Sequence, residues 1–428
     1  MQILFLRNFQ EVTGLKGRSV KKRLYRLFFF SVFLAAVVIG LSFYVDSIIK
    51  KIPKNIYILK NNKATLSFNI PATCEASNKI ADLNKPLTIC ANEPGNYKFK
   101  VKLFGVFETN TVNVNVVEKN FIYPGGFPIG LYLKADGVLA VDTSDIKTIN
   151  GDVINPCQNI IKKGDYIIGA DGQEMKNKDQ LVSYVSKSDG NRITFKLRRK
   201  NEVFDVSVQP VKDENGKYKV GLWVKDDTQG IGTMTYIDKD GNFAALGHGI
   251  TDNQTEELLE SNYGFLYKTK ILSIVKGSNG TPGEYIGTID YNNSNRIGKI
   301  CKNTENGIYG TLNSDLVNDY KLSPMQIGYS NEVQKKKAYI RLYDEKREYK
   351  DYDISIENIS YGNLKNITFK VTSKELIDDT NGIIQGMSGA PIIQDGKFIG
   401  AVTHVFVNDS TRGYGIFAEK MLSQSYTQ

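Results

Sequence analysis

The feature that constrains this chain most is a run without any charged side chain, from Leu27 to Val45. At 1.5 Å per residue, a helix over this run would be roughly 28 Å long, about the thickness of a bilayer's hydrocarbon core. The chain before it carries Glu11 as its acidic residue and a cluster of cations: Arg7, Lys16, Arg18, Lys21, Lys22, Arg23 and Arg26. Because positive flanks stay in the cytoplasm, the N-terminus is predicted to face inward and the chain after the run to face outward.

The alternative to a membrane anchor is a cleaved signal peptide. The apolar run is longer than a usual signal-peptide core, and no clear small-x-small cleavage site follows it. We therefore predict a basic cytoplasmic tail over residues 1–26, an uncleaved transmembrane anchor over residues 27–45 and a linker over residues 46–55. The long remainder of the chain is expected to fold outside the cytoplasm.

The composition of the 428 residues is that of a globular protein, with 41% hydrophobic and 24% charged residues. The formal net charge of +9 invites a nucleic-acid interpretation. The basic residues are spread along the chain, however, and they form no basic and aromatic platform, so we predict no nucleic-acid partner. Short segments that alternate apolar with polar residues, separated by Gly, Asn and Asp, predict a mainly β protein of several domains.

Residues 56–118 are predicted to form a small β domain, because ATLSFNI, NYKFKVKLFGVF and VNVNVV have strand-like patterns. Cys74 and Cys90 are close in sequence and lie in this segment, so they are the best candidates for a disulfide outside the cytoplasm. Four unpaired thiols, which would include Cys157 and Cys301, are an equally good interpretation.

Residues 119–211 begin with a glycine-rich loop and continue with strand, loop and helix signals, among them Asn177 as a helix N-cap. This order and the text GDYIIGADG resemble a PDZ domain. The resemblance places the family's carboxylate-binding loop at Ile129, Gly130 and Leu131. In that family, loop amides hold the end of an extended peptide that adds to a sheet edge. A glycine-rich turn in another kind of β domain is the alternative.

Residues 212–428 contain many short strand candidates and few helical signals. Asp240-Gly241 and Asp395-Gly396 are strong hairpin turns. The strand candidates are GIGTMTYI, FAALGHGI, KTKILSIV, YIGTIDY, KAYIRLY, NITFKVT, APIIQ, FIGAVTHVF and GYGIFA. This pattern predicts a barrel or a sandwich.

The most informative sequence is GMSGAP, which contains Ser388. A serine between glycines on a sharp turn presents its hydroxyl without bulky neighbours, and Gly386 allows an unusual backbone angle. Such a turn can aim the amides of Gly386 and Ser388 at one point, as an oxyanion hole requires. Gly-x-Ser-Gly-x-Pro is also the nucleophile pattern of chymotrypsin-like peptidases. We therefore predict that Ser388 is a nucleophile, with a serine in an ordinary glycine turn as the alternative.

A serine hydroxyl needs a base to react at neutral pH, and the chain has two histidines. His248 lies between glycines in ALGHGI and precedes Ser388, which is the chain order of chymotrypsin-like peptidases. We predict that His248 is the general base, with a structural histidine in a tight turn as the alternative. His404, in the strand candidate AVTHVFV, is predicted to be structural, and its distance from the site is left open.

Other chemistries lack their residues. No HExxH motif occurs, two histidines do not easily build a zinc peptidase site, and no CxxC supports a zinc ribbon. No cysteine lies in a comparable turn, and neither a Walker loop nor a dinucleotide fingerprint is present. We therefore expect neither a metal nor a cofactor.

Longer stretches of text extend the resemblance to a family. The order of anchor, β segment, PDZ and late peptidase resembles the stage IV sporulation protein B peptidases of spore-forming bacteria. The matching text includes GIGTMTYI, ALGHGITD, KGSNGTPGE, NTENGIYG and GIIQGMSGAPIIQDGKFIGAVTHVFVNDSTRGYGIFAE. The resemblance implies a chymotrypsin-like double β-barrel peptidase domain over residues 212–428. It also implies a single-pass membrane enzyme, with its catalytic portion between the forespore and mother-cell membranes. Such an enzyme cleaves itself and a membrane-bound regulator, which activates a sporulation sigma-factor pathway.

One position departs from the family. The resemblance places the third catalytic residue, an aspartate, 15 positions before the nucleophile, where this chain has Ser373. A serine can accept a hydrogen bond from the histidine but cannot offset the imidazolium charge. Loss of the carboxylate from such a triad costs on the order of 10⁴ in turnover. Candidate substitutes are Asp378, Asp379, or a dyad assisted by water.

Three functional interpretations follow. A signalling serine peptidase is favoured by the glycine-flanked His248 and Ser388. A catalytically weak or inactive PDZ scaffold is favoured by Ser373 alone. An HtrA-like quality-control protease is disfavoured, because those proteins place PDZ after the protease and this chain places it before.

Overall fold

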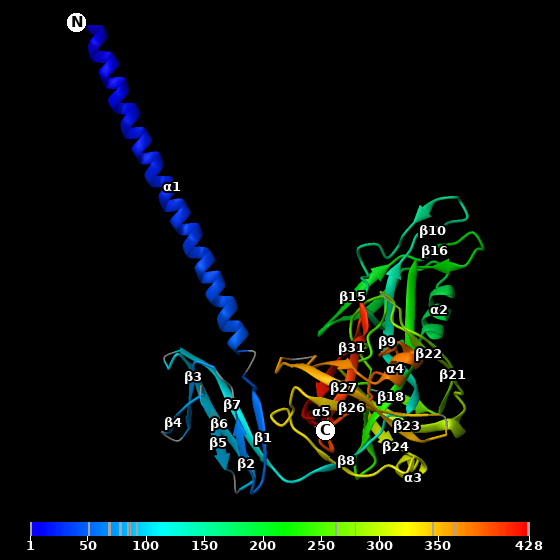
Figure 1. The fold of residues 1–428 in the computed structure, drawn as a ribbon. Coiled ribbons are helices and arrows are strands. Elements are labelled where there is room, and N and C mark those ends of the chain that lie inside the picture. The colour runs from blue at the N-terminus through cyan, green and yellow to red at the C-terminus, as the bar shows by residue number, and fades with distance from the viewer. Residues whose placement is uncertain are drawn as a thin grey trace. The chain divides into compact units, whose positions relative to one another are not determined.

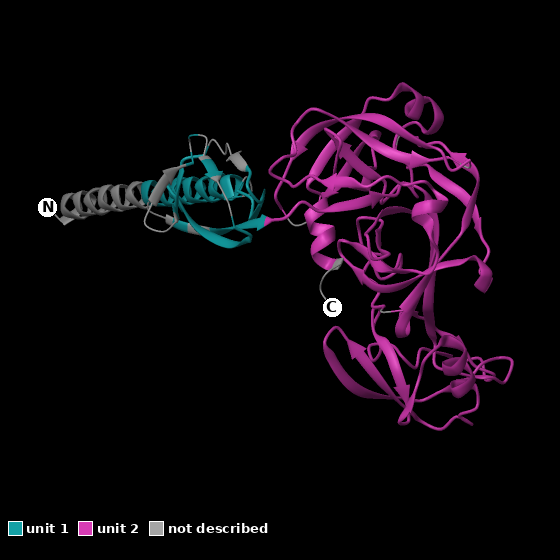
Figure 2. Ribbon diagram, turned by 90° about the horizontal axis from the view of Figure 1, so that it is seen from below, with its two compact units in different colours: residues 1–116 teal, residues 117–428 magenta. Residues whose placement is uncertain are grey.

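The computed structural model describes residues 2–425, with short gaps at 50–51, 67–69, 77–78, 84, 86, 91–92, 106, 262, 279, 345 and 363–364. The chain divides into two compact units, residues 1–116 and residues 117–428, which Figure 2 colours separately. Each unit has its own hydrophobic core clusters.

The first unit begins with helix α1 (Gln2–Ile49), which carries the N-terminus in Figure 1. Its segment Tyr25–Ile49 is long and apolar enough to cross a membrane. The large apolar side chains of this segment, such as Phe29 and Phe33, are exposed. The helix therefore fits the span predicted at residues 27–45, and a signal sequence would have the same character.

The rest of the first unit is a small β domain. Five strands pair in the order β1-β7-β6-β3-β4, and β2 pairs with β5. The strands are β1 (Asn55–Leu59), β2 (Lys63–Leu66), β3 (Ala72–Ala76), β4 (Lys79–Asp82), β5 (Leu87–Cys90), β6 (Gly95–Leu103) and β7 (Phe107–Val117). Ile48 and Ile52 join its core of Ile, Val and Leu side chains. The predicted disulfide between Cys74 and Cys90 involves the Cys90 side chain, which lies outside the described part of the structure.

The second unit contains two closed barrels. The first closes through the pairings β9-β18-β19-β24-β23-β20-β9. Its strands are β9 (Pro128–Thr143), β18 (Leu222–Ile237), β19 (Asn242–Ala245), β20 (Tyr263–Tyr267), β23 (Arg296–Thr304) and β24 (Gly307–Leu312). Phe127, Leu131 and Leu266 lie in its core. The connection from β20 to β23 carries a separate hairpin, β21 (Thr269–Val275) with β22 (Glu284–Ile289), and the short helix η1 (Asn293–Asn295).

The second barrel closes in the same way, through β26-β27-β28-β31-β30-β29-β26. Its elements are β26 (Lys337–Tyr343), β27 (Tyr349–Ile359), β28 (Ile367–Val371), α4 (Lys374–Thr380), β29 (Pro391–Gln394), β30 (Lys397–Phe406), β31 (Asp409–Phe417) and α5 (Ala418–Ser425). Strands β8 (Phe121–Pro124) and β25 (Met325–Ile327) join the barrels, since β8 pairs with β18 and β25 pairs with β30. Helix α3 (Leu316–Asp319) lies between β24 and β25. The mainly β, double-barrel fold class predicted from the sequence is confirmed.

The PDZ lobe is continuous with the first barrel, because strands β9 and β18 extend from the barrel into the lobe. One half of the β9–β18 ribbon lies in the barrel, where Gly130 pairs with Ile231, and the other half lies in the lobe, where Ala140 pairs with Val224. A positive φ of 114° at Gly137 and a shift in register mark the region where the ribbon leaves the barrel. The two strands are therefore shared between both structures.

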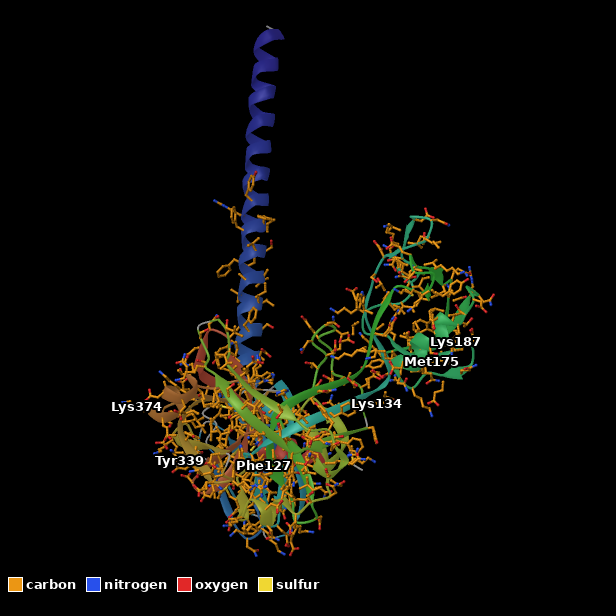
Figure 3. The ribbon with its side chains drawn as sticks, turned by 90° about the vertical axis from the view of Figure 1, so that its right-hand side faces the viewer. Phe127, Lys134, Met175, Lys187, Tyr339 and Lys374 are labelled. Atoms are coloured by element: carbon orange, nitrogen blue, oxygen red, sulfur yellow. The ribbon has the colours of Figure 1, made fainter. Side chains whose placement is uncertain are left out.

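The lobe is completed by short strands and one helix. They are β10 (Ile146–Lys147), β11 (Val153–Ile154), β12 (Tyr166–Ala170), β13 (Gln173–Glu174), α2 (Lys178–Ser186), β14 (Ile193–Arg199), β15 (Glu202–Val208), β16 (Val211–Lys212) and β17 (Tyr218–Lys219). Asn177 caps α2 as predicted, by accepting the Gln180 amide at 2.8 Å. Figure 3 shows Met175 of the lobe core apart from Phe127 of the barrel core. Cys157 is also buried in the lobe core, and Cys157 and Cys301 are free thiols.

Two predictions about this region are corrected by the strand pairing. The lobe core extends to Val220, with Leu222 and Val224 packed against it, so the lobe does not end at residue 211. The proposed carboxylate-binding residues Ile129, Gly130 and Leu131 form no loop. They lie in the barrel half of β9, buried and paired with both β18 and β20. The glycine-rich text there is explained by close strand packing, since a β-carbon on Gly130 would lie 2.8 Å from Ile289 Cγ2.

Candidate active site

The turn that carries Ser388 has the backbone that its glycines suggest. Gly386 and Gly389 have φ angles of 100° and 99°, which side-chain-bearing residues rarely adopt. A β-carbon on Gly389 would lie 2.2 Å from the carbonyl oxygen of Thr233, so the first barrel touches the turn directly. Both glycines are therefore required by the local geometry.

Thr233, near the end of β18, holds this turn from the side of the first barrel. Its hydroxyl donates to the Gly386 carbonyl at 2.6 Å, and its amide donates to the Ser388 carbonyl at 3.1 Å. Its own carbonyl accepts the amide of Leu246 at 3.3 Å, two residues before His248. The side chain is buried. Sequence reasoning missed this residue, although it lies in the family text GIGTMTYI.

The amides of the turn are left available by this arrangement. Within the described part of the chain, neither the Gly386 N–H nor the Ser388 N–H donates a hydrogen bond to a protein acceptor. The adjacent amides are used, since Met387 donates to Ile384 at 3.2 Å and Gly389 donates to Val402 at 2.8 Å. Two unused donors on a rigid turn are what an oxyanion hole needs.

The Ser388 hydroxyl points at strand β30. It donates to the Thr403 carbonyl at 2.6 Å. The histidine segment reaches the same strand, because a β-carbon on Gly247 would lie 3.2 Å from both the Val402 carbonyl and Thr403 Cγ2. The structure therefore brings Ser388 and the His248 segment to one place, although this serine rotamer is bonded to the backbone rather than to the imidazole.

The His248 ring is oriented by a main-chain carbonyl. Its Nδ1 lies 2.8 Å from the Gly249 oxygen. Since a carbonyl oxygen can only accept, Nδ1 carries the proton in the neutral ring and Nε2 has the lone pair. That tautomer is the one a general base requires. Burial lowers the pKa of His248, and the contact with the Gly249 carbonyl opposes this shift in part.

His404, which is predicted to be structural and whose distance from the site the sequence leaves open, lies beside His248. The rings of His404 and His248 lie 4.8 Å apart between centroids, at 36° to each other. Desolvation of the ring, followed by the proximity of His248 and Lys365, lowers the pKa of His404 to about 4, although the residue is exposed at the surface. His404 is therefore neutral near pH 7, and the site contains two neutral imidazoles.

Ser373 has a different role from the one that the resemblance implied. It is the N-cap of helix α4, and its hydroxyl accepts the Leu376 amide at 3.4 Å. Asp378 and Asp379 lie later in the same helix and are exposed. Among the hydrogen bonds and ion pairs of the described residues, none joins a carboxylate to His248. The ring partner observed is the Gly249 carbonyl.

Two closed barrels, one contributing a base candidate and the other a serine in a glycine turn, define a chymotrypsin-like serine peptidase. Residues 216–422 match the model of the SpoIVB peptidase family S55. The family resemblance predicted from the sequence is thereby confirmed.

Other similarities cover smaller parts of the chain. A Clostridium perfringens (strain 13 / Type A) protein that is named as a zinc metalloprotease is 32% identical over 69 residues, which are 16% of this chain and 21% of that protein. The PDZ domain of an SdrC-like protein from Listeria monocytogenes is 19% identical, with 21% of this chain and 87% of that chain covered and a TM-score of 0.17. The active form of the Rv3671c protease from M. tuberculosis is 14% identical, with 47% and 76% covered and a TM-score of 0.27.

Proposed function

We propose that this chain is a membrane-anchored signalling serine endopeptidase in which Ser388 is the nucleophile and His248 the general base. The observation that carries the proposal is the Ser388 turn, whose carbonyls are bonded to Thr233 while the Gly386 and Ser388 amides donate to no acceptor among the described residues. The tautomer of His248 supports the same roles.

The proposed cycle begins with a rotation of the Ser388 side chain. The Ser388 hydroxyl leaves the Thr403 carbonyl and turns to Nε2 of His248, which takes its proton as the oxygen attacks the substrate carbonyl. The amides of Gly386 and Ser388 receive the negative oxygen of the tetrahedral intermediate. His248 then returns the proton to the leaving amine, and water hydrolyses the acyl-enzyme by the reverse sequence.

The positive charge of the His248 imidazolium formed in this cycle is only weakly stabilised. The Gly249 carbonyl fixes the ring and offers a partial negative charge, but no carboxylate of the described residues bonds to it. Removal of the carboxylate from a triad leaves catalysis well above background. A slow peptidase is therefore expected, which suits a switch that needs few turnovers.

The proposed substrates are this chain itself and a membrane-bound regulator of sigma-factor activation, as the family resemblance of its sequence implies. The proposed location is the outer face of a membrane, with α1 as the anchor and the N-terminus in the cytoplasm. The support is the apolar segment of α1 and the cations before it.

The PDZ lobe is proposed to select the protein that is cleaved by binding an extended peptide. Among described strands, the Leu222–Lys225 segment of β18 pairs on one side only, with β9. Such an edge can accept an added strand. Trp223, the chain's single tryptophan, is 63% exposed on this segment, and exposed aromatic side chains are common at protein contacts.

A fluorophosphonate probe on the purified full-length chain tests the nucleophile. Labelling is expected in the wild type and is expected to be absent in Ser388→Ala. An unlabelled, well-folded wild type would support the inactive-scaffold interpretation instead.

Two measurements test the lobe. The Trp223→Ala variant should retain labelling of Ser388 and lose cleavage of the native target. In the wild type, the fluorescence of Trp223 should change when a target peptide binds. Loss of labelling in a folded Trp223→Ala protein would contradict a selective role.

A further inference from the structure

The hairpin β21–β22 binds the main chain immediately before the Ser388 turn. The Tyr285 amide donates to the Gln385 carbonyl at 3.0 Å, and the Gln385 amide donates to the Gly283 carbonyl at 2.7 Å. In a trans peptide the carbonyl and the following N–H point in opposite directions. Fixing the Gln385 carbonyl therefore fixes the direction of the Gly386 N–H, one of the two proposed oxyanion donors.

The Tyr285 side chain also contacts the Gln385–Gly386 peptide. A β-carbon on Gly386 would lie 2.4 Å from Tyr285 Cδ2, so the ring packs directly on the Gly386 α-carbon. The ring also packs against the core of the second barrel. A rotation of the Gln385–Gly386 peptide would have to break a hydrogen bond and displace this ring.

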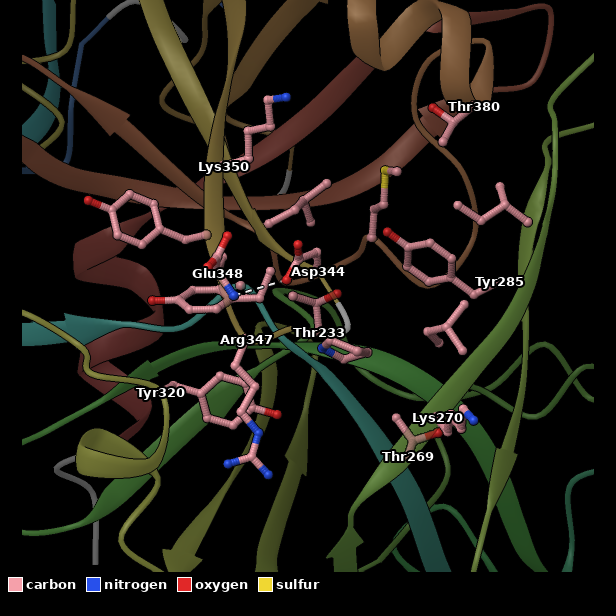
Figure 4. A pocket seen from close by; sticks show the side chains of 18 of the residues that line it. Thr233, Thr269, Lys270, Tyr285, Tyr320, Asp344, Arg347, Glu348, Lys350 and Thr380 are labelled. Atoms are coloured by element: carbon pink, nitrogen blue, oxygen red, sulfur yellow. Dashed lines mark hydrogen bonds between the residues drawn. The ribbon is translucent and has the colours of Figure 1, made fainter.

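The hairpin also contacts both barrels away from Tyr285. Near its turn, the Gly277 amide donates to the Thr380 carbonyl at 3.1 Å, and Asn381 Nδ2 donates to the Gly277 carbonyl at 2.7 Å. Between these contacts a cavity of about 910 Å³ separates β21 from the second barrel. In Figure 4, Thr269 and Lys270 of the hairpin lie across this cavity from Tyr320 and Lys350.

The outward face of the hairpin adds little stability. Leu272 and Ile286 are more than two-fifths exposed, at 56% and 43%. A two-stranded hairpin alone is marginal in water. Its position therefore depends on its contacts with the barrels, which include Ile289 against Gly130 of the first barrel and Tyr285 against the catalytic segment.

We propose that Tyr285 is a positioning residue for the oxyanion hole, through its amide on Gln385 and its ring on Gly386. This inference rests on the proposed roles of Ser388 and Gly386. It extends the control of the Ser388 turn to an insertion in the first barrel, which the chemistry of the turn alone does not require.

The test compares four variants of the full-length chain. Tyr285→Phe keeps both the ring and the amide. Tyr285→Ala removes the ring, and Tyr285→Pro removes the amide donor. Ile286→Ala is the matched control, because Ile286 is the next residue of the same strand and its side chain is exposed. For each protein, the measurements are the rate constant of fluorophosphonate labelling, the final labelled fraction and the melting temperature.

Loss of one oxyanion donor costs about 10²–10³ in rate. The labelling rate constant of Tyr285→Pro should therefore fall about 100-fold and that of Tyr285→Ala about 10-fold, with the final labelled fraction unchanged. Tyr285→Phe and Ile286→Ala should match the wild type. A lower labelled fraction with a normal rate constant in both loss variants would mean a merely structural role and would overturn the inference. A normal rate constant in a folded Tyr285→Ala protein would overturn it too, even if Tyr285→Pro does not fold. An unlabelled wild type would instead refute the proposed nucleophile, and the inference with it.

Discussion

The two barrels close through the same circuit of strands but differ in what interrupts them. In the first barrel, the β9–β18 ribbon runs on into the PDZ lobe, and the β20–β23 connection carries the β21–β22 hairpin. The second barrel carries the Ser388 turn in its β28–β29 connection, between α4 and β29. The first barrel thus receives the additions, and the second holds the nucleophile.

This difference shows how an insertion could influence a distant reaction. Thr233 and Tyr285 both come from first-barrel elements, and both bond to the segment Gln385–Ser388 of the second barrel. β18 runs from the lobe edge at Leu222 through Thr233 to Ile237. A continuous strand that bonds to the catalytic turn through Thr233 is a physical connection, and variants of each barrel can test it.

The largest expected effect lies in the second barrel. Ser388→Ala should reduce peptide cleavage and self-cleavage by at least about 10⁴-fold, because the nucleophile of a serine peptidase is lost. The melting temperature should remain that of the wild type, since the partner of the hydroxyl among the described residues is a single main-chain carbonyl, that of Thr403. Appreciable cleavage by a folded Ser388→Ala protein would exclude this residue as the nucleophile.

Thr233→Val tests the hydrogen bond from the first barrel to the Ser388 turn of the second. Valine keeps the shape but leaves the Gly386 carbonyl without its hydroxyl donor. The turn should loosen, and we expect kcat to fall by about 10-fold, as for a loss of about 1.4 kcal/mol of transition-state stabilisation. Thr233→Ser should restore the rate. Equal kcat in the valine variant would show that the hydroxyl does not position the turn.

The Gly130→Tyr variant distinguishes a role of Gly130 in barrel packing from a role in peptide binding by the lobe. Because Gly130 is buried in β9 against Ile289, a bulky side chain should destabilise the first barrel by about 1–3 kcal/mol. Labelling of Ser388 and cleavage of the target should then decline together with the melting temperature. Normal stability and labelling, with loss of target cleavage alone, would restore the peptide-loop assignment.

Ser373 is the sharpest test of the family's third catalytic position. Ser373→Ala should cost about 0.5–2 kcal/mol of stability through loss of the α4 cap and should change kcat less than about twofold. Ser373→Asp should keep the cap, because aspartate is an equally good N-cap. A large gain in kcat for Ser373→Asp would show that this position reaches His248 after all.

The smallest expected effect is a displacement of the pH profile. Burial lowers the pKa of His248 below its ordinary value of about 6.5, so the neutral base persists to lower pH. The acid limb of kcat/KM should therefore have its midpoint below pH 6.5, since this limb reports the free enzyme. A midpoint above pH 6.5 would indicate a carboxylate partner, which raises the pKa of an imidazole.

The sequence alone determined the apolar segment, the β-rich character and the candidate pair Ser388 and His248. Each of these depends on local pattern: a long uncharged run, alternation of residue types, and glycines beside a reactive side chain. The N-cap at Asn177 was also local, and it is present. The family text carried the peptidase class, which the match over residues 216–422 bears out.

Only the tertiary structure decided the rest, because strand partners and backbone acceptors have no local signature. The glycine-rich text around Gly130 suits a loop or a tightly packed strand, and pairing with β18 and β20 selects the strand. Ser373 matches a catalytic position in sequence, yet the start of α4 uses its hydroxyl as a cap. Thr233, Tyr285 and the Gly249 carbonyl act through main-chain geometry, which long-range packing sets and residue identity does not encode.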